Sequence, residues 1–165
     1  MEIYLLRHGI AAERGSHTGP DEERALTAEG VRKVRRVAQA MRVMRLSFDS
    51  VFSSPLVRAL ETAELVAKSL RLKKRLRVTE HLVPGTPTGT QIAWLRSLRP
   101  APGSVLLVGH EPNFSELASR LLTGQERLAI EFKKAGLCKI TAEPPGSGHG
   151  TLEWLLTPRQ MELMR

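Results

Sequence analysis

Two apolar runs in this chain each lead into a histidine that has a glycine beside it. The run Ile3–Leu6 precedes His8, and the run Val105–Val108 precedes His110. Short apolar runs bounded by glycine and polar residues are typical of buried strands in a parallel sheet. Open α/β sheets bind ligands where such strands end. Two histidines at one sheet edge, one of them next to Arg7, therefore predict a site for an anion.

The order of the predicted elements indicates the fold class. Strands are expected at residues 2–7, 49–53, 76–79, 104–108, 137–142 and 151–156, and helices at 27–45, 55–72, 88–98 and 112–122, with a short last helix after Thr157. The early alternation of strand and helix predicts a three-layer α/β/α fold with a mostly parallel central sheet. The turn-rich connector 144–148 predicts a C-terminal antiparallel hairpin. A chain of 165 residues that is 41% hydrophobic can bury one core, so a single domain over 1–165 is expected.

Local signals mark several helix starts and one long loop. Thr27 is expected to cap the first helix, and Pro55 suits the first position of the second. Either Thr88 or Thr90 is expected to cap the third helix. The polar segment 10–25 contains two glycines and a proline, and it predicts an irregular loop that could overhang the site.

Composition restricts the cellular setting. The single cysteine, Cys138, excludes an intramolecular disulfide and a cysteine-rich metal site. No apolar stretch approaches the roughly 20 residues of a membrane helix. The first residues lack the basic and apolar regions of a signal peptide. We therefore expect a cytoplasmic protein with no metal, cofactor or membrane association, and its oligomeric state is left open.

The formal net charge of +8 needs an explanation. A basic balance can indicate nucleic acid, an anionic membrane or acidic substrates as partners. Basic residues concentrate at 32–45 and 71–77, and the first group is predicted to form the solvated face of an amphipathic helix. Nucleic acid is not an expected partner, because no recognisable module is present and aromatic residues make up only 4%. A non-catalytic anion- or nucleic-acid-binding module stays as the alternative to an enzyme.

Four residues, two arginines and two histidines, could bind an anion. Arg7 carries a planar fork of donors that suits phosphate oxygens. Arg58 is expected in the first turn of a helix, against the helix dipole, which indicates an anionic partner or else an ordinary surface arginine. His110 precedes a helix start, whose free N–H groups favour anions, although a histidine bonded to backbone would look the same. His8 lies beside a fixed cation, where a nucleophile would lie.

Four segments together resemble the histidine phosphatase superfamily, also called phosphoglycerate mutase-like. They are Leu6–Gly9, Leu26–Gly30, Ser53–Ala63 and Val108–His110, in the family's order and spacing. The short length and the Leu82-Val83-Pro84-Gly85 segment are most similar to the bacterial phosphohistidine phosphatases of the SixA type. The resemblance implies a phosphate pocket of Arg7, His8, Arg58 and His110, in which His8 attacks phosphorus. The other three would hold the phosphoryl oxygens, and water would then hydrolyse the phosphohistidine.

The resemblance identifies the general acid less clearly. Family members that act on phosphate esters use a carboxylate as general acid, which implies Glu80 here. A shift of one residue in the match would imply His81 instead. The third alternative is that the protein has no general acid. An imidazole leaving group, with a pKa of about 6.5, needs far less help from an acid than an alkoxide does. The expected substrate is therefore protein phosphohistidine, with a small phosphorylated metabolite as the alternative.

Overall fold

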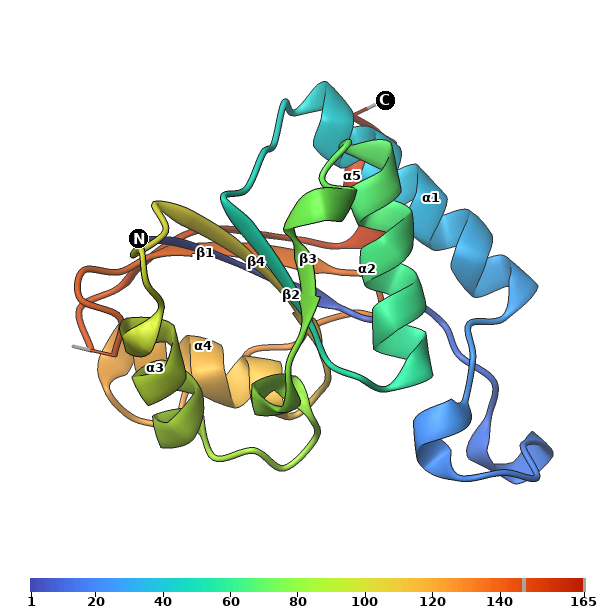
Figure 1. Cartoon of the computed structure of the whole chain (residues 1–165), viewed down its shortest axis with the longest axis horizontal. Helices are drawn as coiled ribbons and strands as arrows, with labels where there is room; N and C mark the ends of the chain where they lie inside the picture. The colour runs from blue at the N-terminus through green and yellow to red at the C-terminus, as the bar shows by residue number, and fades with distance from the viewer. Residues whose placement is uncertain (147, 165) are drawn as a thin grey trace.

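The computed structural model of the protein describes residues 1–146 and 148–164. Its strands are β1 (Glu2–Arg7), β2 (Ser50–Ser53), β3 (Leu76–Val78), β4 (Ser104–Gly109), β5 (Leu137–Thr141) and β6 (Thr151–Leu156). They form one six-stranded sheet in the order β3-β2-β4-β1-β5-β6 (Figure 1). Ser147, within the predicted connector 144–148, and Arg165 lie outside the described residues.

The strand directions confirm the predicted sheet. The pairs β1–β4, β2–β4 and β2–β3 are parallel, whereas β5 is antiparallel to both β1 and β6. The β5–β6 pair is the predicted C-terminal hairpin. Parallel strands bring their carboxyl ends to the same sheet edge, so the segments that follow β1, β2 and β4 meet there.

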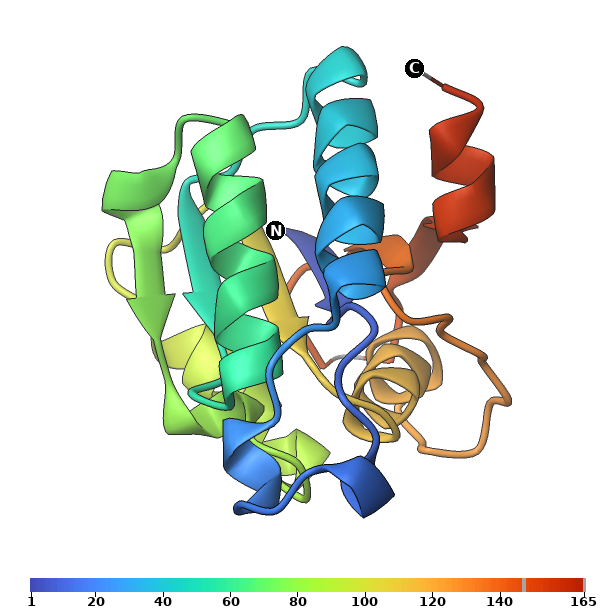
Figure 2. The same cartoon turned by 90° about the vertical axis from the view of Figure 1, so that its right-hand side faces the viewer.

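Helices cover both faces of the sheet. The α-helices are α1 (Ala28–Val43), α2 (Val57–Ser69), α3 (Thr88–Ser97), α4 (Asn113–Thr123) and α5 (Pro158–Glu162), and the short 3₁₀ turns are η1 (Arg14–Ser16), η2 (Asp21–Glu23), η3 (Lys73–Arg75) and η4 (Glu80–Leu82). One face carries α1, α2 and α5, and Figure 2 shows α1 beside α2. The other face carries α3 and α4. The three-layer α/β/α prediction is confirmed. None of the helices in the described ranges is both long and apolar enough to cross a membrane.

The central strands are continuously apolar because both of their faces are covered. In β1, Ile3 and Leu5 pack with the α3–α4 layer, and Tyr4 and Leu6 pack with the α1–α2–α5 layer. Side chains of a strand alternate between the two faces, so every position of β1 between its ends needs an apolar residue. This explains why the run that precedes His8 has no polar position.

Two predicted helix starts are wrong in detail. Helix α2 begins at Val57 rather than at Pro55, because the Ser54 hydroxyl accepts the Leu56 N–H in a turn before the helix (3.3 Å). Helix α3 begins at Thr88 itself, with Pro87 in the capping position. The Thr88 hydroxyl bonds to the Glu126 carboxylate instead of capping.

The caps predicted for the first and last helices are confirmed. The Thr27 hydroxyl accepts the Gly30 N–H at 3.0 Å and caps α1, and Thr157 caps α5 with Gln160 in a reciprocal capping box. Gly30 also lets α1 approach the chain that leaves β1. A Cβ atom at this glycine would lie 2.0 Å from the Ile10 carbonyl oxygen, so any larger residue would displace the segment after His8.

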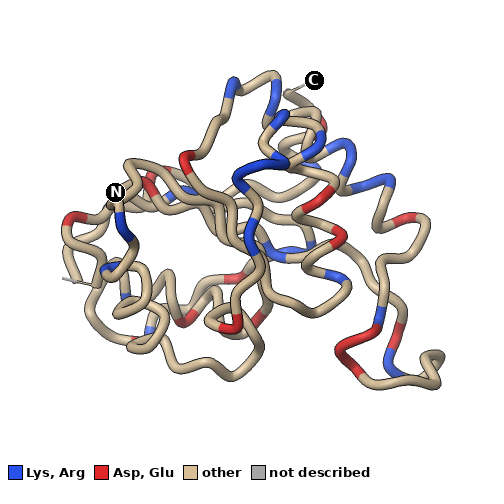
Figure 3. The backbone as a smooth tube through the Cα atoms, viewed as in Figure 1, with Lys and Arg blue, Asp and Glu red and all other residues tan. Residues whose placement is uncertain are grey.

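The basic stripe of α1 faces solvent, as predicted. Arg32, Arg35 and Arg36 are exposed, whereas Val34 and Val37 on the opposite side are buried. Figure 3 shows Lys and Arg recurring along α1, while acidic residues gather at η2. The helix therefore contributes positive charge to the surface without disturbing the core.

Candidate active site

Three parallel strands bring His8, Ser54 and His110 to one edge of the sheet. Each of these residues follows its strand directly, after β1, β2 and β4 respectively. Backbone bonds continue the ladder past the strand ends: His8 N donates to Gly109 O and Ser54 N donates to Val108 O, both at 3.0 Å. The side chains are thus presented by extended backbone that the sheet itself holds.

A backbone carbonyl determines which nitrogen of His8 is free. Nδ1 lies 2.7 Å from the Gly9 carbonyl oxygen, which can only accept, so Nδ1 carries the proton. The Nε2 lone pair is then available for attack. Burial lowers the pKa of His8 to about 4, and the nearby Arg58 and Arg7 act in the same direction. The imidazole is therefore neutral at pH 7, as a nucleophile must be.

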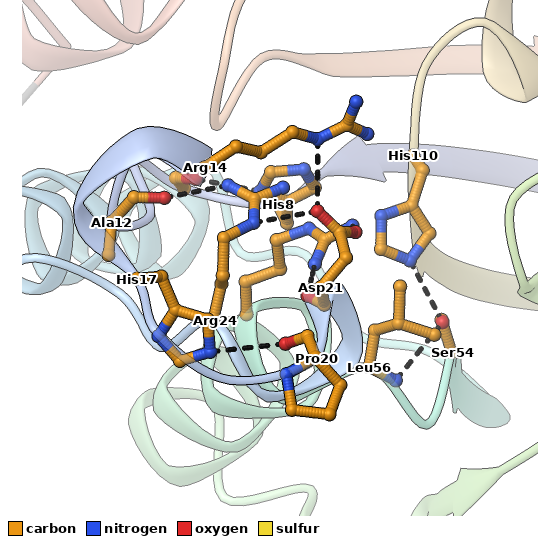
Figure 4. A network of polar contacts seen from close by, with 12 residues as sticks. His8, Ala12, Arg14, His17, Pro20, Asp21, Arg24, Ser54, Leu56 and His110 are labelled. Atoms are coloured by element: carbon orange, nitrogen blue, oxygen red, sulfur yellow. Dashed lines mark hydrogen bonds and ion pairs between the residues drawn. The ribbon is translucent and has the colours of Figure 1, made fainter.

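His110 faces His8 across the site. The two ring centroids are 5.1 Å apart, and the His110 Nε2 lies 2.8 Å from the Ser54 hydroxyl oxygen (Figure 4). A side-chain hydroxyl therefore holds this ring, not backbone. Nδ1 is buried and has no hydrogen-bond partner among the described residues. Burial, followed by the proximity of His8 and Arg58, lowers the pKa of His110 to about 3.

Arg58 extends from the first turn of α2 toward the loop 10–25. Its side chain is 4% exposed, and it donates from Nη1 to the Asp21 carbonyl oxygen (2.7 Å) and from Nη2 to the Asp21 carboxylate (3.0 Å). Arg24 and Arg14 bind the other carboxylate oxygen (Figure 4). The Arg24 bond and then the charge of Arg58 lower the pKa of Asp21 to about 2. The anionic partner predicted for Arg58 is, in this structure, a carboxylate of the chain itself.

Within the described residues, three buried nitrogen atoms close to His8 have no hydrogen-bond partner. Two belong to arginine N–H donors, and His110 Nδ1 is a donor in the tautomer whose Nε2 accepts from the Ser54 hydroxyl. Arg7 uses Nη1 to bond the Phe132 carbonyl oxygen at 2.6 Å, but its Nε is unpartnered, as are Arg58 Nε and His110 Nδ1. Buried donors are almost always paired in proteins. Both arginines lower the pKa of both histidines, which places the four groups within electrostatic reach of one another. Such a set of donors fits a tetrahedral oxyanion held against His8.

Thr62 connects the two halves of this site. Its hydroxyl accepts the Gly9 N–H at 3.1 Å and donates to the Arg58 carbonyl oxygen at 2.7 Å. The residue is fully buried on α2. It therefore keeps the loop that carries His8 in register with the helix that carries Arg58.

Within the described residues, no hydrogen bond or ion pair links Glu80 to the other four predicted residues. Glu80 is exposed at the start of η4, and within the described residues its carboxylate makes no hydrogen bond or ion pair. His81 stacks on Trp94, with ring centroids 5.1 Å apart, and so has a packing role. The assignment of either as the general acid stays a prediction that this geometry does not favour.

Two acidic residues near the site were not singled out from the sequence. Asp21 lies among several acidic residues of a polar loop, and no local pattern distinguishes it. Glu111 follows His110 directly and is half-buried. One carboxylate oxygen accepts from Ser115, and the other is buried with no partner in the described part of the chain. Burial raises its pKa, opposed by the Ser115 bond and Arg7. The sequence signal that could have identified Glu111 is its position directly after His110.

The donor set suits an anion better than a cation. Two guanidinium groups repel metal ions, and no group of three His, Cys, Asp or Glu residues within 1–146 and 148–164 is arranged to bind one. The pocket can therefore orient a phosphoryl group with this chain's own nitrogen atoms.

The two buried histidines are expected to make folding stability depend on pH. Their pKa values of about 4 and about 3 lie below the unfolded value of about 6.5. Between these values the unfolded chain binds protons that the folded chain does not, so stability falls as pH falls from about 6.5 to about 4. We expect the urea midpoint to decrease over this interval in wild type and to decrease less in H110Q. An equal decrease in both would contradict this account.

Comparisons with known proteins place the chain in a class. The sequence model of the Histidine phosphatase superfamily (branch 1) matches residues 3–83, and the chain belongs to this superfamily. Along its whole length it is similar to phosphohistidine phosphatase SixA of Escherichia coli K12, with 28% identity over 166 residues covering 100% of this chain and 99% of that protein.

Two further matches extend this result. An uncharacterized protein of Picosynechococcus sp. is 38% identical over 138 residues, which cover 83% of this chain and 82% of that protein. A solved structure of the protein histidine phosphatase SixA complexed with tungstate has a TM-score of 0.85 at 29% identity, and the match covers 96% of this chain and 98% of that one. The fold and a phosphatase activity are therefore supported together.

Proposed function

We propose that this protein is a phosphohistidine phosphatase that acts on phosphorylated proteins through a covalent intermediate on His8. The observation that carries the proposal is the set of unpartnered buried donors, Arg7 Nε, Arg58 Nε and His110 Nδ1, beside a neutral imidazole with a free Nε2. Positioning and charge stabilisation are what phosphoryl transfer chiefly requires. Similarity to SixA over the whole chain supports the same conclusion.

In the proposed reaction, the His8 Nε2 forms a bond to phosphorus as the bond from phosphorus to the substrate nitrogen breaks. Arg7, Arg58 and His110 hold the non-bridging oxygens. A bound phosphoryl anion next to His110 raises the pKa of this histidine, so His110 gains a proton more readily when substrate is present. Water then attacks phosphorus, the N–P bond to His8 breaks, and phosphate leaves. The Gly9 carbonyl keeps Nδ1 protonated and so prepares Nε2 for the next cycle.

The leaving group supports phosphohistidine over an ester. A phosphohistidine ring whose second nitrogen is protonated leaves as neutral imidazole, whereas an alkoxide must receive a proton in the reaction. The exposed Glu80 carboxylate makes no hydrogen bond or ion pair within the described residues, so the chain does not hold the predicted donor toward an alkoxide. Without a proton donor for the leaving alkoxide, ester hydrolysis is expected to be slower than phosphohistidine hydrolysis.

A substrate panel tests the proposal. We expect kcat/KM for a phosphohistidine peptide to exceed that for sugar phosphates by roughly 100-fold, the lower range of a general-acid contribution. Release of inorganic phosphate from both substrates and from a chromogenic aryl phosphate measures this directly. Efficient cleavage of sugar phosphates together with no cleavage of the peptide would overturn the proposal.

Glu111 favours one alternative, the hydrolysis of a small phosphorylated metabolite. Its half-buried carboxyl has a raised pKa and follows His110, which is the environment of a proton donor for an alkoxide. In that case E111Q would slow ester hydrolysis far more than phosphohistidine hydrolysis. Equal rates for E111Q and wild type on esters would remove this alternative.

A further inference from the structure

A hollow of about 640 Å³ opens beside Arg7. It lies between α1, α5 and the segment before β5, and five of its lining residues are basic: Arg7, Lys33, Lys133, Lys134 and Arg159. The remaining lining residues are Ile10, Thr157, Pro158 and Glu162. The balance of charge in its wall is therefore strongly positive.

Backbone bonds hold this basic segment against the catalytic strand. Ala135 N donates to the carbonyl oxygens of both Arg7 (3.1 Å) and His8 (3.0 Å), and Arg7 N donates to Gly136 O (3.1 Å). Ala135 has a φ of 62°, a left-handed conformation that a non-glycine residue keeps only when its surroundings enforce it. Lys133 and Lys134 are thus fixed in place beside the residues that would hold the phosphoryl group.

The cations of the hollow are mostly uncompensated. Within the described residues, the side chains of Lys33, Lys134 and Arg159 make no hydrogen bond or ion pair, while Lys133 pairs with the exposed Glu131. The acidic residue of the wall, Glu162, pairs with Arg36 at 3.5 Å. Lys134 is close enough to the nucleophile to contribute to the lowered pKa of His8. Uncompensated charge next to a reaction centre attracts anionic groups of whatever enters it.

We propose that this hollow binds carboxylates next to the phosphorylated residue of an acidic protein substrate. The inference rests on the proposed function, since the phosphoryl group held by Arg7 places the rest of the substrate at the mouth of the hollow. Sites for small metabolites use a few well-placed polar groups in an enclosed cavity. Here Lys133, Lys134 and Arg159 are exposed at the surface. Exposed cations of this kind match an acidic surface whose exact geometry varies.

The chain contains a matched pair of variants for the test. K133E/K134E reverses the charge of the lysine pair beside the hollow. K73E/K74E reverses the charge of another exposed lysine pair, at η3 by the opposite edge of the sheet. Both change the net charge by the same amount. Any difference between them therefore reports position and not overall charge.

The experiment compares two phosphohistidine peptides, one flanked by Asp and Glu and the other by Asn and Gln. In wild type we expect kcat/KM to favour the acidic peptide by about tenfold or more at low salt, as for electrostatic steering. The preference is expected to fall toward one in K133E/K134E, to persist in K73E/K74E, and to weaken as salt is added. Equal rates for both peptides in wild type, or equal loss in both variants, would overturn the inference.

A binding measurement separates this inference from the proposed function. The whole chain carrying H8A is titrated with the same two peptides, so the result does not depend on hydrolysis. If the acidic peptide binds more tightly and K133E/K134E reduces this preference, the result supports carboxylate binding in the hollow even if wild type cleaves neither peptide. Equal affinity for both peptides would contradict the inference that the hollow binds substrate carboxylates. The phosphatase proposal would be unaffected, because the substrate panel tests it separately.

Discussion

Replacing His8 with alanine is expected to lower turnover by roughly 10⁴- to 10⁶-fold, as removal of a covalent nucleophile does elsewhere. The reason is geometric. The Gly9 carbonyl holds the proton of the ring on Nδ1, and burial keeps the ring neutral, so Nε2 is a prepared nucleophile. The rate of phosphate release measures the loss. Quenching with alkaline denaturant and labelled substrate should recover phosphoprotein from wild type and none from H8A, because the N–P bond of phosphohistidine survives base but is cleaved by acid.

The control replaces a histidine that has no part in the site. His149 is exposed, and H149A is expected to retain wild-type turnover and the same phosphoprotein signal. Circular dichroism and a thermal melt establish that H8A remains folded. Turnover by H8A within about tenfold of wild type would exclude His8 as the nucleophile, given the losses expected for such a residue. Retained anion binding by wild type without any turnover would favour the non-catalytic module.

The strand ends of this fold were predictable because local pattern and tertiary packing agree there. In β1 and β4 every position between the ends must be apolar, since helices cover both faces of the sheet. The same pattern places the following polar residues at the carboxyl edge. The convergence of His8 and His110 follows from parallel pairing, in which Arg7 lies opposite Gly109.

The contacts that orient the site were not predictable, because each joins residues distant in the chain. Ser54 positions His110 across 56 residues, and Asp21 reaches Arg58 across 37. Neither contact leaves a periodic or spaced pattern in the sequence. The start of α2 was misplaced for a related reason, since a side chain of the preceding turn takes the N–H of Leu56. Local propensity had favoured Pro55, and a tertiary arrangement at the site overrode it.

Glu80 illustrates a different limit. Its prediction came from a resemblance in a segment without a strong motif, and a shift of one residue would have chosen His81. The 3₁₀ turn η4 leaves Glu80 exposed and turns His81 onto Trp94. Three residues of such a turn place neighbouring side chains in quite different directions, so sequence position alone cannot decide between them.

The second large effect is expected from R58A, which should lower kcat/KM by roughly 10²- to 10⁴-fold, as loss of a donor to a transferring phosphoryl group does. Arg58 gives one N–H of each Nη to Asp21, so its Nε, which is unpartnered within the described residues, and the second N–H of each Nη are the donors that it can offer a substrate. Asp21 would then be a support that orients the guanidinium. Steady-state kinetics on the phosphohistidine peptide measures the effect.

Arg14 provides a matched control for this variant. It binds the same carboxylate of Asp21 at the same 3.0 Å, but its side chain is 81% exposed, against 4% for Arg58. An exposed ion pair contributes only about 0–1 kcal/mol, so R14A should change kcat/KM by no more than a few-fold. R58K should recover little, because a lysine keeps the charge but lacks the fork and the Nε donor. Equal losses in R14A and R58A would instead mean that the Asp21 network supports the loop, and that Arg58 does not contact the phosphoryl group.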